Sequence, residues 1–169
     1  MWERWTLTAA VIGVVGSLAG SGRAQEGAAK PVRMPLDEAR RTVAMLNDAY
    51  VNAVVGMHTT YVKDAGSTPA ASVARQLFVA MKKQGWPETR WLSTTGRPLN
   101  PDAAPKDAFE RDAVAALNKK QARFERVEKG RLRVVTVIPL VDKSCQTCHA
   151  RDKVGDPVGG LSYTVYLKQ

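Results

Sequence analysis

The feature that most constrains this chain is the pentapeptide CQTCH at residues 145–149. It contains both cysteines of the 169-residue sequence and one of its two histidines. A disulfide between Cys145 and Cys148 would close a very short loop, and such a bridge restrains little of the unfolded chain. We therefore expect the two thiols to carry chemistry, and we expect the rest of the chain to position them.

Two cysteines in the spacing C-x-x-C, followed directly by a histidine, are typical of covalent c-type haem attachment. Cys145 and Cys148 would form thioethers with the haem vinyl groups, and His149 would be an axial iron ligand. Two alternatives stay open. A redox dithiol normally opens a helix in a βαβ unit, a pattern that does not precede this motif. A zinc site would need His58 as its fourth ligand. We expect one covalently attached haem c.

The second axial ligand of this iron is not determined by the motif. His58 is the remaining histidine and Met57 is its neighbour, but adjacent helical residues diverge by about 100°, so one helix would not present both to the same iron. Met45, Met81 and an open or water-filled position are further alternatives. Two histidines favour a low-potential iron, a methionine raises the potential, and an open position permits binding of a gas.

The first 24 residues have the pattern of a secretory signal peptide. Arg4 precedes an apolar run over residues 7–20, and small residues at the −3 and −1 positions predict cleavage after Ala24. A retained membrane anchor is the alternative, but the run is shorter than the roughly 20 residues that span a bilayer. Loss of Arg4, Arg23 and Glu3 would change the net charge from +9 to +8 and leave 169 − 24 = 145 residues. We expect a periplasmic protein with no nucleic-acid partner.

Apolar spacing predicts three helices. The first is long, begins at Leu36 and carries an apolar stripe of Leu36, Val43, Leu46, Tyr50, Val54, Met57 and Tyr61. The second follows a cap at Ser67 or Thr68 and ends at residues 84–86, and its expected inner side contains Val73, Leu77, Val79 or Ala80, and Met81. The third covers residues 106–120, with Phe109, Val114 and Leu117 facing inward.

Four strands are predicted, over residues 89–94, 123–127, 131–140 and 158–168. The two middle strands form a hairpin around the loop EKG at residues 128–130. We therefore predict an α+β domain over residues 36–169, after a flexible lead-in over residues 25–35. Its small antiparallel sheet would have the long N-terminal helix and the further helices packed on one side.

The predicted hairpin is strongly basic. Seven cations and two anions lie between residues 119 and 133, and the cations are Lys119, Lys120, Arg123, Arg126, Lys129, Arg131 and Arg133. One or two of the arginines could pair with haem propionates, because a guanidinium matches a carboxylate. The others could dock an acidic redox or signalling partner. A solvated face without a partner is the alternative.

The order of these segments resembles a family of single-haem c-type proteins with a PAS-like sensor fold, the Tll-type haem-binding domains, also found fused to bacterial sensor kinases. The resemblance covers Leu36 to Lys168 and rests on MKKQGWPETRWLS (81–93), GRPLNPDAAPKDAFERDAV (96–114), a strand ending in PL before CQTCH, and GGLSYTVYLK (159–168). It implies a PAS-like domain that cradles one haem against its sheet. Some members are described as using a cysteine as the second axial ligand, but this chain has no cysteine outside its attachment motif.

Together these features predict a haem-binding module for redox or gas sensing through a separate partner. A soluble periplasmic electron-carrier cytochrome is the alternative function. A peroxidase-like enzyme would need an open iron and a distal acid–base group. His58 could serve as that group, but no distal arginine or carboxylate can be placed beside it from the sequence, so we expect no enzymatic activity.

Overall fold

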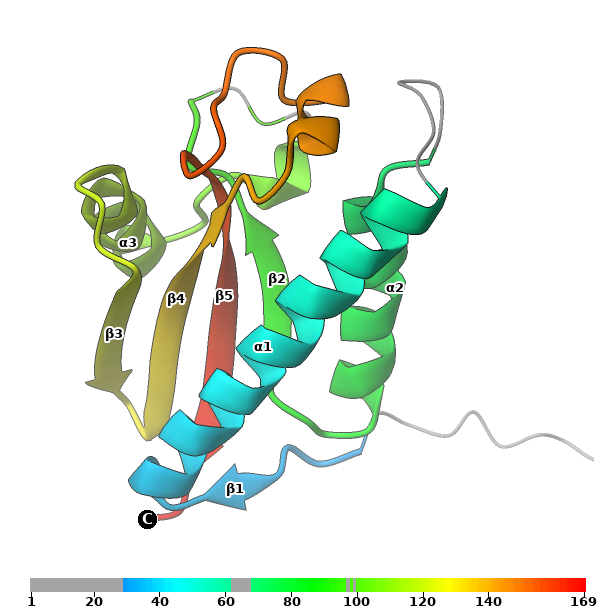
Figure 1. The fold of residues 1–169 in the computed structure, drawn as a ribbon. Helices are drawn as coiled ribbons and strands as arrows, with labels where there is room; N and C mark the ends of the chain where they lie inside the picture. The colour runs from blue at the N-terminus through cyan, green and yellow to red at the C-terminus, as the bar shows by residue number, and fades with distance from the viewer. Residues whose placement is uncertain (1–28, 62–67, 97, 99) are drawn as a thin grey trace, which may run out of the picture.

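The computed structural model describes residues 29–61, 68–96, 98 and 100–169. Within them, one curled sheet has helices on both faces (Figure 1). The elements, in chain order, are β1 (Arg33–Met34), α1 (Leu36–Tyr61), α2 (Ala70–Lys83), β2 (Glu88–Leu92), η1 (Pro101–Ala103), α3 (Ala108–Asn118), β3 (Arg123–Glu128), β4 (Arg131–Pro139), η2 (Lys143–Thr147) and β5 (Pro157–Leu167). The predicted α+β class is confirmed.

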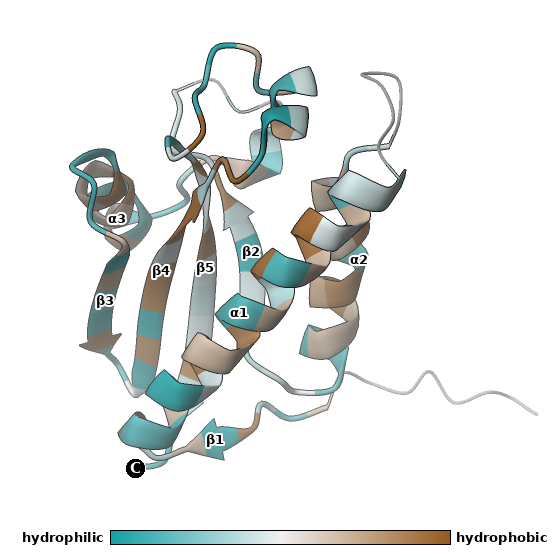
Figure 2. Ribbon diagram, viewed as in Figure 1, coloured by the Kyte–Doolittle hydropathy of each residue, from teal (hydrophilic) through white to brown (hydrophobic). Residues whose placement is uncertain are grey.

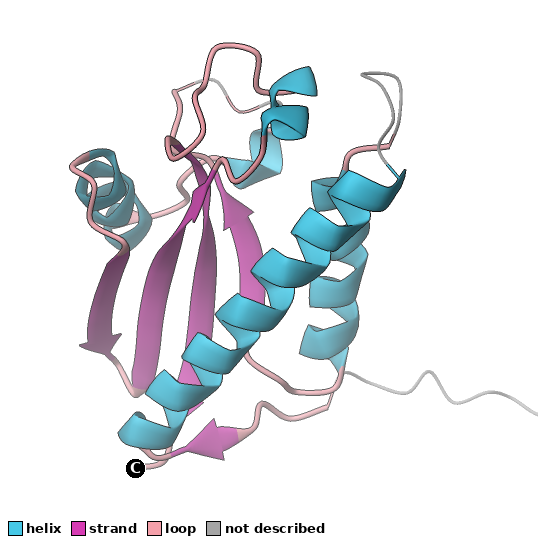
Figure 3. Cartoon of the chain, in the orientation of Figure 1, coloured by secondary structure: helices cyan, strands magenta, loops and turns pink. Residues whose placement is uncertain are grey.

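Strand β5 is the centre of the sheet. It pairs antiparallel with β4 along one edge and with β2 along the other, and β3 pairs with β4 at the outside (Figure 3). Beyond the end of β2, the two residues of β1 pair with Tyr166 and Leu167 of β5 in the parallel direction. The sheet is therefore mixed, and the prediction of a purely antiparallel sheet is wrong for β1.

Helices α1 and α2 pack on one face of the sheet. Of the predicted stripe on α1, Val43, Leu46 and Tyr50 are buried, whereas Tyr61 is exposed. The stripe meets the face of β5 that was expected to point inward, and the members of that face are Leu161, Tyr163, Val165 and Leu167. The long helix and the strand that it covers were therefore predicted correctly.

Helix α2 turns a different side to the sheet than the sequence predicted. Its buried residues are Ala70, Ala74 and Phe78, while Val73 and Leu77 are exposed. The alanines are small enough for α2 to lie close to β2, where the indole of Trp91 donates a hydrogen bond to the Ala71 carbonyl at 2.8 Å. No side chain caps this helix: Pro69, rather than Thr68, takes the N-cap position, and Ser67 lies outside the described residues.

Helix α3 lies on the opposite face of the sheet, so the prediction that all helices pack on one side is wrong. Successive side chains of a strand point to opposite faces. In β4, Val134 accordingly belongs to the core under α1 and α2, and Val135 to a second core with Phe109 and Leu117 of α3. Figure 2 shows hydrophobic residues along most of β4. Both of its faces are covered.

The chain before α1 is tied to the rest of the domain. Ala29 N–H donates to the Lys83 carbonyl at 2.9 Å, and Val32 N–H donates to the Gly85 carbonyl at 2.8 Å. The described part of the predicted flexible lead-in is thus hydrogen-bonded, while the predicted signal peptide lies outside the described residues. Among the helices that the structure describes, none has the length and apolar character to cross a membrane.

Strands β3 and β4 are joined by a two-residue turn. Lys129 has φ +48° and Gly130 has φ +70°. Positive φ at both central residues is the geometry of a type I′ turn, whose twist matches that of the flanking strands. Glu128 pairs with Arg131, so the predicted loop was one residue too long.

Candidate functional site

Cys145, Cys148 and His149 lie in a loop between the end of β4 and the start of β5, which we call the cysteine loop (residues 141–156; upper part of Figure 1). Pro139 and Pro157 face each other where the ladder stops, and neither has an N–H to continue it. Leu140 N–H donates to the Asp156 carbonyl, and its carbonyl accepts from Gly155 N–H, both at 2.8 Å. The sheet therefore holds the two ends of the loop together.

Within the cysteine loop, the 3-10 turn η2 presents the two cysteines. Asp142 begins the turn by accepting the Ser144 N–H at 2.8 Å. The Cys145 carbonyl then accepts the N–H groups of Cys148 at 3.2 Å and His149 at 3.0 Å. Both cysteines are free thiols; Cys145 is half-buried and Cys148 is exposed. One short turn thus brings together all three residues of the predicted attachment motif.

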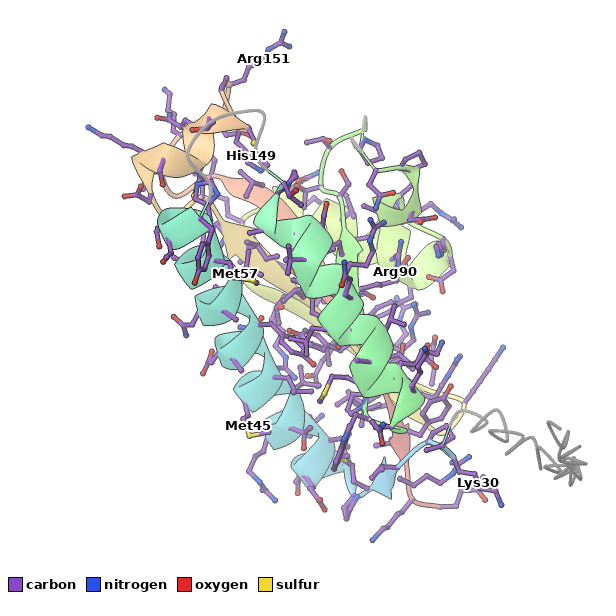
Figure 4. The ribbon with its side chains drawn as sticks, turned by 90° about the vertical axis from the view of Figure 1, so that its right-hand side faces the viewer. Lys30, Met45, Met57, Arg90, His149 and Arg151 are labelled. Atoms are coloured by element: carbon purple, nitrogen blue, oxygen red, sulfur yellow. The ribbon has the colours of Figure 1, made fainter. Side chains whose placement is uncertain are left out.

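His149 ends this turn with its imidazole 39% exposed. Its Nδ1 lies 3.3 Å from Asp152 Oδ2 (His149 is labelled in Figure 4). Asp152 was not predicted from the sequence as a partner of His149. The available signal was its spacing of three residues from His149, which brings two side chains together when the intervening chain forms a turn.

His58 lies on the C-terminal turn of α1, at the same end of the molecule as the cysteine loop (Figures 1 and 4). Hydrogen bonds from Ser144 lower the pKa of Asp142, and the charge of His58 adds a smaller lowering effect, so His58 lies near the start of the loop. The His58 Nε2 atom is buried and has no hydrogen-bond partner among the described residues. The hydroxyl oxygens of Tyr50 and Thr89 are also buried without a partner among the described residues, but His58 is the one of these three residues whose free nitrogen could bind a metal as well as a water.

The three methionines that the sequence left as alternatives differ from His58 in their surroundings. Met45 is 64% exposed in the half of α1 that is far from His149 (Figure 4). Met57 and Met81 pack against the hydrophobic core under α1 and α2. Met57 adjoins His58 near the C-terminal end of α1, but its side chain packs against the core, whereas His58 Nε2 has no hydrogen-bond partner among the described residues.

The basic hairpin begins near the cysteine loop, because Arg123 of β3 pairs with Thr136 of β4, three residues before Pro139. Its turn is at the opposite end of β4, and eight residue steps of about 3.3 Å put Arg131 roughly 26 Å from Pro139. Three of its arginines have carboxylate partners within the domain: Arg123–Glu125 at 2.7 Å, Arg126–Asp112 at 3.0 Å and Arg133–Asp107 at 2.6 Å. These carboxylates occupy the three arginines within the domain, and the pairing of a hairpin arginine with a haem propionate stays a prediction.

Two further features bear on the alternatives. Across residues 29–61, 68–96, 98 and 100–169, no three His, Cys, Asp or Glu side chains form a group that could hold a metal ion, so the zinc reading has no preformed ligand set there. A cavity of about 360 Å³, lined in part by Lys30, Trp86 and Tyr166, lies at the opposite end from His149 and contains none of the predicted site residues (Figure 4).

Comparison with known proteins agrees with this architecture. The model of the Tll0287-like family matches residues 28–162, a range that contains the whole cysteine loop. The chain belongs to the Tll0287-like family. The crystal structure of the cyanobacterial heme-protein Tll0287 superposes with a TM-score of 0.54 at 21% sequence identity, covering 78% of this chain and 97% of that one. This likeness is consistent with the predicted PAS-like fold. No curated protein matches the chain.

The residues of this end fit the predicted c-type haem. The two thiols are unpaired and accessible, as thioether formation requires. His149 follows them directly and is partly exposed. At the same end of the molecule, the buried Nε2 of His58 has no hydrogen-bond partner among the described residues. Two thiols that can form thioethers and an imidazole that can bind iron are the groups that a c-type haem requires.

Proposed function

We propose that this chain is an exported haem c module in which Cys145 and Cys148 hold one haem through thioether bonds and His149 is an axial ligand. Membership of the Tll0287-like family and the fold shared with a cyanobacterial heme-protein support this proposal. The sheet holds the loop that carries the three residues at both of its ends. Covalent attachment takes place outside the cytoplasm, in agreement with the proposed signal peptide and its cleavage after Ala24.

The strongest support for the proposal is the buried Nε2 of His58, which has no hydrogen-bond partner among the described residues. Leaving a buried polar group without a hydrogen bond costs about 1–3 kcal/mol. An axial bond to iron would remove that cost, and His58 lies at the end of the domain where His149 is found. We therefore assign His58 as the second axial ligand.

A haem with two histidine ligands supplies a one-electron centre of low potential. The chain's own residues supply its anchoring and its axial ligation. With both axial positions taken by side chains, we propose a redox-sensing role through a separate partner rather than gas sensing, and we propose that the domain is not an enzyme.

Exposed cations around the cysteine loop favour an acidic protein partner, and we call Lys143, Arg151 and Lys153 the basic rim. In the part of the chain that the structure describes, none of the three forms an ion pair, and Asp142, Asp152 and Asp156 contact groups of the loop itself. This rim takes the docking role first assigned to the hairpin. It equally favours the second candidate function, an electron carrier, since positive rims steer acidic redox partners.

The test is a visible spectrum of the exported protein, reduced and oxidised, with and without carbon monoxide. We expect a low-spin iron that does not take up carbon monoxide. His58→Ala should retain the covalent haem but become high-spin and bind carbon monoxide, while Met45→Ala, on the exposed side of the same helix, should leave the spectrum unchanged. A His58→Ala protein that stays low-spin and ignores carbon monoxide would remove His58 from the site.

A further inference from the structure

We propose that Asp152 is a positioning residue for His149, and that its carboxylate lowers the reduction potential of the haem iron; this inference rests on the function proposed above. His149 Nδ1 and Asp152 Oδ2 are 3.3 Å apart. When Nδ1 carries the proton it donates to this carboxylate, and the ring lone pair is then on Nε2. A histidine whose Nδ1–H is held in this way has its metal-binding nitrogen selected and its ring orientation restrained.

The backbone of the loop holds Asp152 in place for this contact. Asp152 N–H donates to the His149 carbonyl at 3.0 Å, which closes the turn between the two residues. Gln146 Nε2 donates to the Asp152 carbonyl at 2.8 Å and ties the same residue back to η2. The aspartate is therefore fixed through both backbone groups, and its side chain is left to meet the imidazole.

The other two aspartates of the cysteine loop have different partners. Asp142 accepts the Ser144 N–H, and Asp156 accepts the Lys153 N–H at 2.8 Å. Both make backbone contacts that order the loop. Among the three, Asp152 is the one whose carboxylate contacts His149. Its charge can therefore act on the iron through the His149 imidazole.

The sign of the effect follows from charge. A carboxylate that accepts the Nδ1–H makes the imidazole a more electron-rich ligand. Such a ligand stabilises the oxidised iron, which carries one more positive charge, relative to the reduced iron. Removing the carboxylate charge should therefore raise the reduction potential. The side chains of His149 and Asp152 are 39% and 37% exposed, so solvent screens part of this effect.

The experiment compares Asp152→Asn with Asp156→Asn in the haem-loaded, exported protein. Each variant removes one negative charge from the same loop and keeps an oxygen that can accept a hydrogen bond. We expect Asp152→Asn to shift the oxidised-to-reduced ratio at a fixed solution potential on the order of tenfold, equivalent to 59 mV for one electron. Asp156→Asn should shift it clearly less.

Two further readouts separate this role from a merely structural one. Asp152→Glu keeps the charge and should restore a potential close to that of the wild type. In proton NMR of the loaded protein, the His149 Nδ1–H should exchange with solvent faster in Asp152→Asn than in Asp156→Asn.

Equal potential shifts in the two Asn variants, with covalent haem present in both, would overturn the role of Asp152 and leave the haem function intact. A loaded Asp152→Glu protein whose potential matches that of Asp152→Asn would overturn it as well. A wild-type protein without covalent haem would instead overturn the proposed function, and this inference with it.

Discussion

The α3 face of the sheet and the cysteine-loop end treat their polar groups in opposite ways. On the α3 face, Glu110 is 2% exposed, yet its carboxylate accepts from Arg90 at 2.6 Å, from Lys106 N–H at 2.8 Å and from Ser162 at 2.9 Å. At the cysteine-loop end, His58 Nε2 is buried and has no hydrogen-bond partner in the described part of the chain. The first pattern orders the fold, and the second indicates a group that binds there.

The cations of the two regions follow the same division. Arg133, which is 8% exposed, has Asp107 at 2.6 Å and Glu128 at 3.3 Å as carboxylate partners. The cations of the basic rim have no such partners in the described part of the chain. Buried charges are stable only when they are paired, whereas exposed unpaired cations remain available to a second molecule.

The largest expected effect comes from breaking the pairing on the α3 face. Glu110→Gln should lower the free energy of unfolding by about 3–5 kcal/mol, because the partly buried Arg90 and the nearly buried Arg133 lose this counterion. Asp112→Asn removes an exposed pair with Arg126 and should cost at most about 1 kcal/mol. Urea unfolding measures both. Equal losses of unfolding free energy in the two variants would show that the buried pair of Glu110 stabilises the fold no more than the exposed pair of Asp112.

The matching change at the cysteine-loop end should have the opposite sign. In a haem-free background with Cys145→Ala and Cys148→Ala, His58→Leu should leave the free energy of unfolding unchanged or raise it by about 1 kcal/mol, because it removes a buried polar atom that has no partner. Urea unfolding of the background with and without His58→Leu gives the number. A loss of several kcal/mol would mean that the imidazole already has a structural partner, and the comparison would fail.

The pH dependence of stability gives a smaller effect on the α3 face. Burial alone would raise the pKa of Asp107, but hydrogen bonds from Arg133 and the Glu110 N–H, with the Arg133 charge, lower it below 3.8. The depressed pKa contributes stability above pH 3.8, and that contribution disappears as the pH falls through the folded-state value. Because Asp107 is 46% exposed, we expect less than about 1 kcal/mol.

Asp107→Asn tests this contribution because asparagine can still cap α3. Its unfolding free energy, measured between pH 5 and pH 3 on the scale where carboxyl groups titrate, should fall less steeply than that of the wild type. Parallel curves for the two proteins would remove Asp107 from the acid response.

The basic rim gives the smallest expected effect. Reduction of the haem by a small anionic reductant should slow a few-fold as ionic strength rises, because salt screens the attraction of exposed charges. Lys143→Glu with Arg151→Glu should slow it at low salt, whereas Arg131→Glu, at the far end of β4, should not. Stopped-flow rates decide, and equal slowing by both variants would assign the steering to net charge rather than to the rim.

Periodicity predicted those parts of the fold in which hydrophobic character and burial coincide. The stripe on α1 through Val43 and Leu46, and the inner face of β5, are of this kind. The prediction for α2 was wrong because alanines give a closer approach to the sheet than the larger valine and leucine that were expected inside. The position of α3 on the second face, and the parallel pairing of β1, depend on contacts between distant segments that a local pattern does not encode.

The candidate site divides in the same way. Cys145, Cys148 and His149 are adjacent in the sequence, so spacing alone indicated their joint role. His58 could be proposed as the remaining histidine, but its unpartnered nitrogen becomes visible only in the folded chain. Asp152 and the exposed cations Lys143, Arg151 and Lys153 were not singled out, because the sequence does not show which charges pair internally.

The most direct test of the central claim is the intact mass of the protein exported by a host that has haem-loading machinery. For the wild type we predict the mass of the polypeptide that starts at Gln25 plus the mass of one haem. For the variant with both Cys145→Ala and Cys148→Ala we predict the mass of the polypeptide alone. A wild-type protein with the mass of the polypeptide alone would contradict covalent attachment, and the role of the cysteine loop would have to be assigned to its free thiols.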